Sequence, residues 1–540
     1  MIKCIIPIFL SLSLASLSVG QTSSIWKKYQ EAKKAGNEEP LPDYSYAGYG
    51  FGEKAIPDVE AEVFNVTDFG AFPDDGKADL EGIQDAINAA EENGGGIVFF
   101  PPGRFLVSEV EGASKCIEIR GSNIVLRGSG SDEGGTTLFM RHRLFPADPK
   151  IGWSIPPAVY FTPLDKGLSS REILMAKGNA EARLAADAQR GDFQIKVADA
   201  SGFKVGEVVS IAAEGTRLNS YYLDGLKTRE NWERINTRGV AVTEKHLIKK
   251  IEGNTLVFHA PLHDRFLVSD DWAVIVYPVL EECGFEDIHV EGNFHEVYVH
   301  HKQNGFGAVS MESCLNSWIR RCRFTNLING AAFSGCVASS MLLNEIGGNP
   351  GHSSFSISFG TNNLFGLSRD VCGYYHGPNV SHLAIGSVVW RYTADHGARG
   401  GPDFHATFPQ VTLWDACDSK YLDSHGGNFK DLPNHLGGLT LWNFNQTGKP
   451  DKDVDYWDLL PGQPDKPYGP LTVVKPTIVG FHGADTTFDR STVGYLESLG
   501  RAVSPESLYE AQLELRLGKK PEWIEQAKTE WKEIIEDRTE

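Results

Sequence analysis

Histidines are concentrated in one part of this 540-residue chain. Eleven of the 16 histidines lie between His289 and His435. Among them, His352, His376 and His396 follow one another at steps of 24 and 20 residues. An imidazole has an unperturbed pKa of about 6.5, so it can accept or donate a proton near neutral pH. The repeated spacing indicates a row of side chains suited to acid–base chemistry.

Two Asp-x-His units lie in the same region. Asp403 precedes His405 by two residues, and Asp423 precedes His425 in the same way, 20 residues further on. In a strand, residues i and i+2 point to the same face, so each carboxylate would lie beside its imidazole. If 20 residues make one turn of a repeating fold, the two units become neighbours. The pattern predicts a strip of imidazoles and carboxylates on one face.

The β-elimination of a uronic-acid polysaccharide requires groups of this kind. The uronate carboxylate must be neutralised, a base must remove the acidic C5 proton, and an acid must protonate the leaving oxygen. Either His376 or His405 fits the role of the base, with Tyr375 as its acid or base partner. Arg399 and Asn379 fit the neutralisation of the carboxylate.

Other polar and aromatic side chains flank these residues and would contact the substrate. The candidate catalytic residues are His376, His405, Tyr375, Arg399, His396 and His425. The candidate substrate-binding residues are Asn379, Arg369, Arg391, His352, Asn434, His435 and Trp442. Trp442 is a candidate because an aromatic face can stack on a sugar ring, although its strand-like surroundings favour core packing equally.

A metal site is an alternative use of the same residues. The two Asp-x-His units together offer two imidazoles and two carboxylates, a ligand set that suits a transition metal, with Asp403 and Asp423 as the carboxylates. Calcium prefers oxygen ligands and would instead use Asp418 or Glu345. A divalent cation, either calcium or a transition metal, is therefore a possible cofactor, and none is required by the pattern.

Short apolar strands, without long helices between them, must position these residues. Ile319, Met341, Leu364 and Leu383 lie in successive strand-like runs at steps of 22, 23 and 19 residues. A period of about 20 residues is typical of a solenoid with one coil per repeat. A β-sandwich would instead show hairpin turns every ~8–12 residues. The period favours the solenoid.

The N-terminal part carries a motif of its own. A strand and two turns precede a helix with an apolar face, for which Asp79 is the expected N-cap, and a glycine run ends that helix. The segments that carry the motif are Asp68-Phe69-Gly70-Ala71, Asp74-Asp75-Gly76, Ile83-Gln84-Asp85-Ala86-Ile87, Gly94-Gly95-Gly96-Ile97-Val98 and Phe100-Pro101-Pro102-Gly103.

These segments together resemble the N-terminal signature of the pectate-lyase-like superfamily. The resemblance implies an all-β chain folded as a single-stranded right-handed parallel β-helix, with the helix capping the first coil. It does not specify the reaction, because lyases, hydrolases and phage adhesins share this fold.

The motifs of the best-known branches of that superfamily are missing. The polygalacturonase pattern combines an adjacent Asp pair, Gly-His-Gly and Arg-x-Lys, and Ser424-His425-Gly426 is its nearest counterpart here. The calcium and arginine motifs of pectate lyases are not evident either. An inverting glycoside hydrolase needs two carboxylates about 6.5–9.5 Å apart, which Asp403 and Asp423 could supply. The sequence leaves hydrolysis open and favours elimination.

Two further regions depart from the repeat. Residues 175–272 alternate as strands around charged loops and predict a β-rich insertion beside the substrate groove, whereas residues after 500 have a helical period. We expect the C-terminal helices to cap the last coil, whose sheet edges would otherwise be exposed. The expected divisions are 1–20, a signal peptide; 21–58, an extended N-terminal arm; 59–174, the N-terminal β-helix; 175–272, the insertion; 273–500, the coils that carry the site; and 501–540, the C-terminal helices.

Composition limits the partners. The formal net charge of −20 argues against a nucleic-acid binder, which needs a concentrated positive field, but an acidic shell can enclose a cationic groove. Residues 1–20 have the charged start, apolar centre and small-residue end of a signal peptide, which predicts a secreted or periplasmic protein. No later run is long enough to span a membrane.

The seven cysteines beyond that segment are spread singly, and most lie in apolar runs, so we interpret them mainly as core thiols.

The sequence as a whole predicts a secreted, monomeric polysaccharide lyase. Its expected partner is an anionic polysaccharide that contains uronic acid and is possibly sulfated, cleaved by β-elimination. The alternatives are an inverting glycoside hydrolase on the same fold and a non-catalytic carbohydrate-binding adhesin. An adhesin would spread exposed aromatic residues along the whole solenoid, whereas here the unusual residues are concentrated in one third of it.

Overall fold

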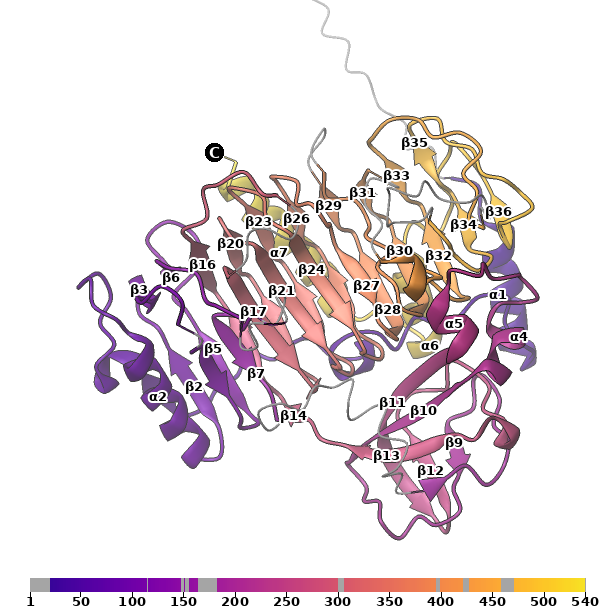
Figure 1. Ribbon diagram of the computed structural model, residues 1–540, viewed down its shortest axis with the longest axis horizontal. Helices are drawn as coiled ribbons and strands as arrows, with labels where there is room; N and C mark the ends of the chain where they lie inside the picture. Colours follow the sequence, from indigo (N-terminus) through magenta and orange to yellow (C-terminus); the bar gives the residue numbers. More distant parts are fainter. Residues whose placement is uncertain are drawn as a thin grey trace, which may run out of the picture.

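The structure is a computed structural model, which describes residues 20–113, 115–146, 150, 155–163, 182–299, 305–394, 399–420, 427–457 and 471–539. The predicted signal peptide, apart from Gly20, lies outside the described residues. Figure 1 shows a solenoid of short parallel strands with an antiparallel domain beside one end. Among the described residues, no helix has the length and apolar character needed to cross a membrane.

Three parallel sheets form the sides of the solenoid. We call them sheets I, II and III in the order in which the chain meets them within a coil. Sheet I contains β1 (Val63–Asn65), β2 (Gly96–Phe99), β5 (Ile124–Arg127), β15 (Gly284–Glu286), β19 (Trp318–Arg320), β22 (Ser340–Leu342), β25 (Leu364–Gly366), β28 (Ile385–Trp390), β30 (Gln410–Asp415), β32 (Leu439–Trp442), β34 (Thr477–Val479) and β36 (Tyr495–Glu497).

Sheet II contains β3 (Gly103–Ser108), β6 (Thr136–Met140), β16 (Ile288–Gly292), β20 (Arg323–Thr325), β23 (Glu345–Gly347), β26 (Arg369–Asp370), β29 (Thr393–Ala394), β31 (Asp418–Ser419), β33 (Asn445–Gln446) and β35 (His482–Gly483). Sheet III contains β4 (Ile117–Ile119), β7 (Val159–Phe161), β17 (Gly307–Glu312), β21 (Asn329–Ser334), β24 (Ser353–Ser358) and β27 (Asn379–Ser381). A short parallel pair, β14 (Leu280–Glu281) and β18 (Cys314–Leu315), lies at a corner.

The register of sheet I confirms the predicted stacking in one place and corrects it in two others. Ile319 pairs with Met341, as the 22-residue step predicts. Met341 pairs with Phe365 and Leu364 with Val388, so both of these coils are 24 residues long, and the predicted steps of 23 and 19 residues are wrong. Leu383 lies in the corner between sheets III and I, so it is not the coil equivalent of Leu364.

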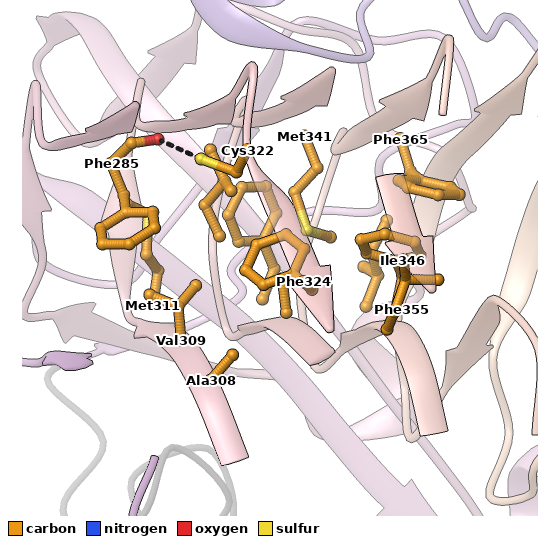
Figure 2. Close-up of a cluster of buried hydrophobic side chains, with 14 of the residues drawn as sticks. Phe285, Ala308, Val309, Met311, Cys322, Phe324, Met341, Ile346, Phe355 and Phe365 are labelled. Atoms are coloured by element: carbon orange, nitrogen blue, oxygen red, sulfur yellow. Dashed lines mark hydrogen bonds between the residues drawn. The ribbon is translucent and has the colours of Figure 1, made fainter. Parts of the chain in front are cut away.

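The interior of the solenoid is filled by apolar side chains from all three sheets. Phe324, Phe355 and Phe365 form a ladder in which neighbouring rings lie 6.1 and 4.8 Å apart (Figure 2). Alternation along each strand directs every second side chain inward, which is why the apolar residues of the short runs share one core. Five cysteines are buried in the structure, as predicted for core thiols: Cys283, Cys314, Cys322, Cys336 and Cys417.

The predicted N-terminal helix is present as α2 (Leu80–Glu92), which buries Ile83, Ile87 and Ala90 against the first coil. Asp79 lies at the predicted N-cap position, but its side chain makes no capping hydrogen bond to the helix. Its carboxylate accepts hydrogen bonds from the backbone N–H groups of Phe72 and Leu106 at 2.9 and 2.6 Å instead. These buried donors occupy both carboxylate oxygens, so the side chain joins the helix start to the first coil.

The antiparallel domain runs from Ala182 to Tyr277. Its sheet has the strand order β8-β13-β10-β11-β12-β9. The elements are β8 (Ala182–Arg183), β9 (Gln194–Lys196), β10 (Val208–Gly215), α4 (Asn219–Tyr222), α5 (Glu233–Thr237), β11 (Val240–Glu252), β12 (Thr255–Phe258) and β13 (Ala273–Tyr277). Its core continues onto the solenoid through Leu383, Ala406 and Phe408, so the domain supports the loops of the late coils.

Three helices cover the outer face of sheet I rather than its end. They are α1 (Ser24–Ala35), α6 (Leu508–Leu517) and α7 (Glu522–Asp537). Outward side chains of the sheet, among them Trp390 and Trp442, pack with Trp26 and Trp523 of the helices. Arg538, just after α7, reaches back to Asp132 near the first coils, at 2.7 Å. The expectation that the C-terminal helices cap the last coil is therefore wrong, because the apolar outer face of sheet I requires the cover.

The described residues also contain single 3-10 turns that connect these elements. They are η1 (Tyr49–Gly52), η2 (Val66–Phe69), η3 (Thr216–Leu218), η4 (Val268–Asp270) and η5 (Phe429–Asp431).

Candidate active site

Two imidazoles share one buried carboxylate next to the last strand of sheet III. The Oδ2 atom of Asp403 lies 3.1 Å from Nδ1 of His376 and 3.3 Å from Nδ1 of His405. The side chain of Asp403 is 0% exposed, that of His376 7% and that of His405 33%. His405 is therefore the member of this group, which we call the His–Asp–His cluster, that solvent and substrate can reach.

The coil stacking of sheet III brings these three residues together. Asn379 of β27 forms a parallel bridge with Asp403, and Ser353 of β24 forms one with His376. The N–H of His376 donates to the carbonyl of His352 at 2.7 Å, so the 24-residue histidine step is one coil. Residues far apart in the chain meet because each coil places its equivalent position above the last.

The imidazoles form a row. The ring of His376 lies 4.9 Å from that of His352 and 5.4 Å from that of His405. The ring of His382 lies 5.9 Å from that of His405. His382 is absent from the sequence-based candidates because its position fits none of the coil steps. Its place in the histidine-rich region was the one feature of the sequence that could have identified it as a candidate.

A phenol and a guanidinium adjoin the row. The ring of Tyr375 lies 4.8 Å from that of His376, and the exposed guanidinium of Arg399 lies 5.2 Å from the centre of the Tyr375 ring. Tyr298, also absent from the sequence-based candidates, stacks on His352 at 5.7 Å. An exposed cation, a phenol and imidazoles thus line one surface.

The charges of the cluster are coupled. Burial alone would raise the pKa of the Asp403 carboxyl, but the two imidazoles outweigh burial and hold that pKa well below its usual value. Burial alone would lower the pKa of His405, but its hydrogen bond and its attraction to Asp403 raise that pKa above 6.5. Asp403 is therefore ionised at neutral pH, and it makes His405 a stronger base.

Two oxygen atoms beside the cluster are buried and make no hydrogen bond within the described part of the chain. They are Oδ1 of Asp403 and Oδ1 of Asn379. One ligand atom each from His376, Asp403 and His405 also lies within 4.8 Å of the others, an arrangement that could hold a divalent cation. The predicted metal site pairs the carboxylates of Asp403 and Asp423. Asp403 is described, whereas Asp423 lies outside the described residues.

Small side chains continue from the cluster along the outer face of sheet III. In register with Asp403 and Asn379 are Ser356, Ala332 and Ser310, one from each preceding coil. All three are half-buried, whereas the alternate residues of these strands fill the core. The sheet thus presents a narrow floor without large side chains that ends at the cluster.

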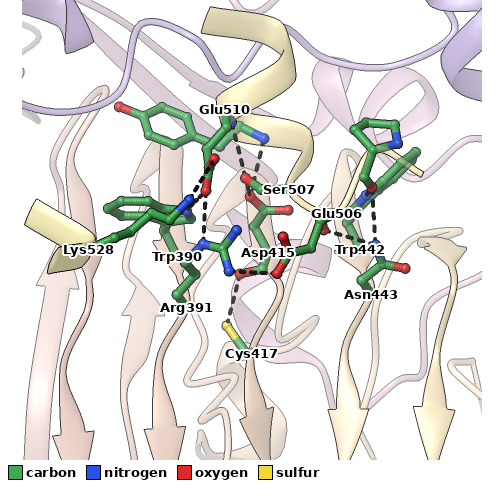
Figure 3. Close-up of polar contacts among 12 residues, drawn as sticks. Trp390, Arg391, Asp415, Cys417, Trp442, Asn443, Glu506, Ser507, Glu510 and Lys528 are labelled. Carbon is green, nitrogen blue, oxygen red and sulfur yellow. Dashed lines mark hydrogen bonds and ion pairs between the residues drawn. The ribbon is translucent and has the colours of Figure 1, made fainter. Parts of the chain in front are cut away.

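Several predicted substrate-binding residues lie away from the cluster. Figure 3 shows Arg391 bound to Glu506 and Glu510, each at 2.8 Å. Trp442 is 0% exposed beneath the C-terminal helices and donates to the carbonyl of Pro505 at 2.9 Å. Both residues hold the helices on sheet I, so their predicted contact with substrate is wrong.

Sheet II accounts for another of these residues. Arg369 donates to Glu345 at 2.7 Å, and Arg323 also pairs with that carboxylate, at 3.2 Å. Because Glu345 is buried between arginines, it is not available to calcium either, and the predicted substrate role of Arg369 is wrong.

Asn434 and His435 are buried behind the site. Asn434 donates to the carbonyl of Phe404 at 2.6 Å, and His435 contacts Thr412 at 3.0 Å. Burial lowers the pKa of His435 to about 4, so this ring is neutral. Asn434 supports the Asp403–His405 segment from within, whereas His435 is bound to Thr412 of β30, and neither side chain reaches the surface. His396 and His425, two predicted catalytic residues, lie outside the described residues.

A substitution of Arg391 tests whether this residue has a structural role rather than a role in substrate binding. Replacing Arg391 with alanine should lower the free energy of unfolding by about 3 kcal/mol, because Glu510 stays buried with a weaker set of partners. The kcat/KM of the folded variant should not change. Urea unfolding and steady-state rates check both parts. Arg143→Ala, which removes an exposed pair with Glu111, is the control and should change stability by less than about 1 kcal/mol. A stable Arg391 variant with impaired activity would restore Arg391 to the site.

Residues 63–151 match the family model described as rhamnogalacturonase A/epimerase, pectate lyase-like. This part of the chain is pectate-lyase-like. The match confirms the superfamily resemblance of the N-terminal motif. Residues 373–527, which include the His–Asp–His cluster, match a different family, described as a domain of unknown function (DUF4955).

Curated relatives match a short part of this chain. It is 44% identical over 68 residues to mannuronan C5-epimerase AlgE6 of Azotobacter vinelandii, covering 12% of this chain and 8% of that protein. It is 43% identical over 70 residues to alginate lyase 7 of the same organism, covering 13% of this chain and 8% of that protein. The match thus spans less than a tenth of the length of either relative.

Solved structures are similar over more of the chain at low identity. The A-module of AlgE6 from Azotobacter vinelandii has a TM-score of 0.41 at 15% identity, covering 80% of this chain and 89% of that one. An exopolygalacturonase from Thermotoga maritima has a TM-score of 0.35 at 14% identity, covering 85% and 94%.

Proposed function

We propose that this protein is a secreted, monomeric polysaccharide lyase that cleaves an acidic, uronic-acid-containing polysaccharide by β-elimination. The observation that carries the proposal is the His–Asp–His cluster, in which a buried carboxylate holds a partly exposed imidazole beside a phenol and an exposed guanidinium. These are the three kinds of group that the elimination requires: a base, an acid and a cation for the substrate carboxylate.

His405 acts as the base in this mechanism. Its Nδ1–H donates to Asp403, which leaves Nε2 of the neutral ring with the lone pair that accepts the C5 proton. His376 donates to the same Oδ2 atom and keeps Asp403 in place. Asp403 also stabilises the imidazolium that forms, so it lowers the barrier to proton removal.

The other groups complete the reaction. Arg399, with the amide of Asn379, neutralises the uronate carboxylate, which makes the C5 proton more acidic. As His405 takes that proton, the C5–H electron pair forms the C4–C5 double bond and the C4–O bond breaks. Tyr375, beneath Arg399 and beside His376, donates its phenol proton to the leaving oxygen. One product carries an unsaturated uronate at its new non-reducing end, and the other has a new reducing end.

Elimination is favoured over inverting hydrolysis by the state of Asp403. An inverting hydrolase needs one carboxylic acid that keeps its proton at working pH. The two imidazoles lower the pKa of Asp403, so this group is ionised and cannot be that acid. An adhesin would have no use for titratable groups that meet at one point of the solenoid.

The substrate lies along sheet III in this proposal. The floor formed by Ser310, Ala332 and Ser356 leads to Asn379 and Asp403, with one residue per coil. Coils lie about 4.8 Å apart in a parallel sheet, close to the length of one sugar residue in an extended chain. The names of the curated relatives make mannuronan and alginate the first substrates to test.

The proposed reaction is tested with a panel of anionic polysaccharides. The wild-type protein is incubated with alginate, polygalacturonate, glucuronan and glycosaminoglycans, and both ultraviolet absorbance and reducing ends are followed. Absorbance from a C4–C5 double bond on at least one polymer is expected. Reducing ends without that absorbance would establish hydrolysis instead, and binding without cleavage of any polymer would favour the adhesin.

A cation at the cluster is the second candidate mechanism, favoured by the Oδ1 atom of Asp403, which is buried and makes no hydrogen bond to any described residue. Because both imidazole Nδ1 atoms already contact Asp403, we expect chelation to leave the rate unchanged. Turnover is measured after dialysis against EDTA, and after the return of zinc, manganese or calcium. A loss of activity that one of these ions restores would show that the cluster binds a cation.

A further inference from the structure

A second concave site lies apart from the His–Asp–His cluster. Its volume is about 580 Å³, within the usual range of ligand pockets. Four segments of the chain form its walls: α1 and the residues after it, Arg190 to Phe193 and Pro261 to His263 of the antiparallel domain, and α6. No residue of the cluster lines it.

Aromatic rings form part of the wall. Phe193 is 42% exposed, although an isolated phenylalanine gains nothing from contact with water. The ring of Tyr46 lies 6.0 Å from that of Phe193 and is covered on one side by the guanidinium of Arg516 at 4.0 Å. Two adjacent rings, one of them open to solvent, form a surface on which a sugar ring can stack.

The cavity is cationic in an acidic protein. Four basic side chains line it, against the two carboxylates of Glu39 and Asp43, whereas the whole chain carries a net charge of −20. Lys33 pairs with both of those carboxylates, at 3.0 and 2.9 Å, and so neutralises part of their charge. Of the other three basic residues, Arg516 pairs with Glu53 at 2.6 Å, so the positive charge that remains comes from Lys34 and Arg190.

Arg190 and Arg516 are held in place with part of their hydrogen-bonding capacity open. Arg190 donates to the main-chain carbonyls of Leu41 and Glu39, at 2.6 and 3.4 Å, and forms no ion pair in the described part of the chain. Arg516 pairs with Glu53 at 2.6 Å, while its Nε atom is buried and makes no hydrogen bond to any described residue. Arg190 therefore holds a fixed guanidinium without a carboxylate partner among the described residues, which suits it to bind a carboxylate of a ligand.

We propose that this cavity is a non-catalytic binding site for an acidic oligosaccharide, with a uronate carboxylate on Arg190 and a sugar ring on Phe193. The class of ligand rests on the proposed function, because the same polymer would be held at the cavity and cleaved at the cluster. Among the described residues that line the cavity, the single imidazole, His263, is bound to Asn362 at 2.6 Å, so it is not available as a base for cleavage.

The test measures binding in a catalytically silent background. His405→Ala protein is titrated calorimetrically with mannuronate tetrasaccharide from alginate, and with neutral mannotetraose as the uncharged probe. Two binding events are expected for the anionic probe and none at the cavity for the neutral one. Arg190→Gln and Phe193→Ala should each raise the Kd of the binding event at the cavity at least about tenfold and leave the Kd of the other event unchanged. Arg183→Gln and Phe72→Ala, exposed residues outside the cavity, are the matched controls.

The cavity variants in the wild-type background provide a second readout. Phe193→Ala should leave kcat/KM for short oligosaccharides unchanged and raise KM for the intact polymer. Thermal unfolding checks that the Arg190→Gln variant is as stable as the wild type. If it is less stable, Phe193→Ala, which removes no hydrogen bond, tests the proposal in its place.

The outcomes separate this proposal from the proposed function. Binding that Arg190→Gln and Phe193→Ala leave unchanged, or equal binding of the neutral probe, would overturn the cavity site even if the wild type is an active lyase. Loss of one event in these variants would support the site even if no polymer yields an unsaturated product, which would overturn only the lyase.

Discussion

Replacing His405 with alanine should lower kcat on the cleaved polysaccharide by at least about 100-fold. His405 is the exposed imidazole of the cluster, and its hydrogen bond to Asp403 holds the ring with Nε2 as the basic atom. Alanine removes the atom that accepts the C5 proton, while Arg399 and Tyr375 remain to bind substrate, so KM should change by much less. Initial rates of double-bond formation measure both constants.

His482→Ala is the matched control for this prediction. His482 is a half-buried histidine of a later coil, in β35, and its Nδ1 atom contacts the nearby carbonyl of Gly480, at 2.8 Å. Its removal should leave kcat unchanged. If His405→Ala and His482→Ala behave alike, His405 is not the base, and the same measurement on Tyr375→Phe then identifies whether the phenol takes that role.

Replacing Asp403 with asparagine should both lower the maximal rate and change its pH dependence. In the wild type, His405 must be neutral to accept a proton, so kcat/KM should rise as the pH passes a pKa that Asp403 holds above 6.5. Asparagine cannot stabilise the imidazolium, so the pKa of His405 falls and the acidic limb of the profile shifts to lower pH. The maximum should fall at least about 100-fold, because an amide can also select the wrong tautomer of the ring.

A pH–rate profile of both proteins checks the direction of this shift. Asp415→Asn is the control, since Asp415 is an equally buried aspartate that accepts from the backbone N–H of Leu508 at the start of α6. That substitution should affect stability without moving the acidic limb. An Asp403→Asn profile with an unshifted limb would show that the titrating base is not coupled to Asp403, which contradicts the mechanism.

Much of the fold could be predicted from the sequence because its determinants are local. The segments from Asp68 to Gly103 combine turns, a helix with apolar spacing and a buried strand, and each of them forms in the structure as α2, β2 and the flanking turns. The pairing of Ile319 with Met341 follows from a coil length that the apolar runs mark directly. Stacking of identical coils converts such a period into a three-dimensional repeat.

The sequence also determined which chemistry was available. It placed histidines one coil apart, and the contact of His352 with His376 follows from that spacing. The Asp-x-His spacing put Asp403 beside His405, because alternate residues of an extended segment share a face.

Only the tertiary structure decided which of the polar residues act together. Arg391 and Trp442 are indistinguishable in sequence from residues of a binding groove, yet sheet I directs them under the C-terminal helices. His382 has no coil spacing, yet the corner of one coil places it beside His405. Corner lengths and the contacts made across sheets depend on segments that are distant in the sequence, such as Arg391 and Glu506, which are 115 residues apart. No local sequence pattern predicts these contacts. The row of histidines could therefore be predicted, but the full set of residues that form the site could not.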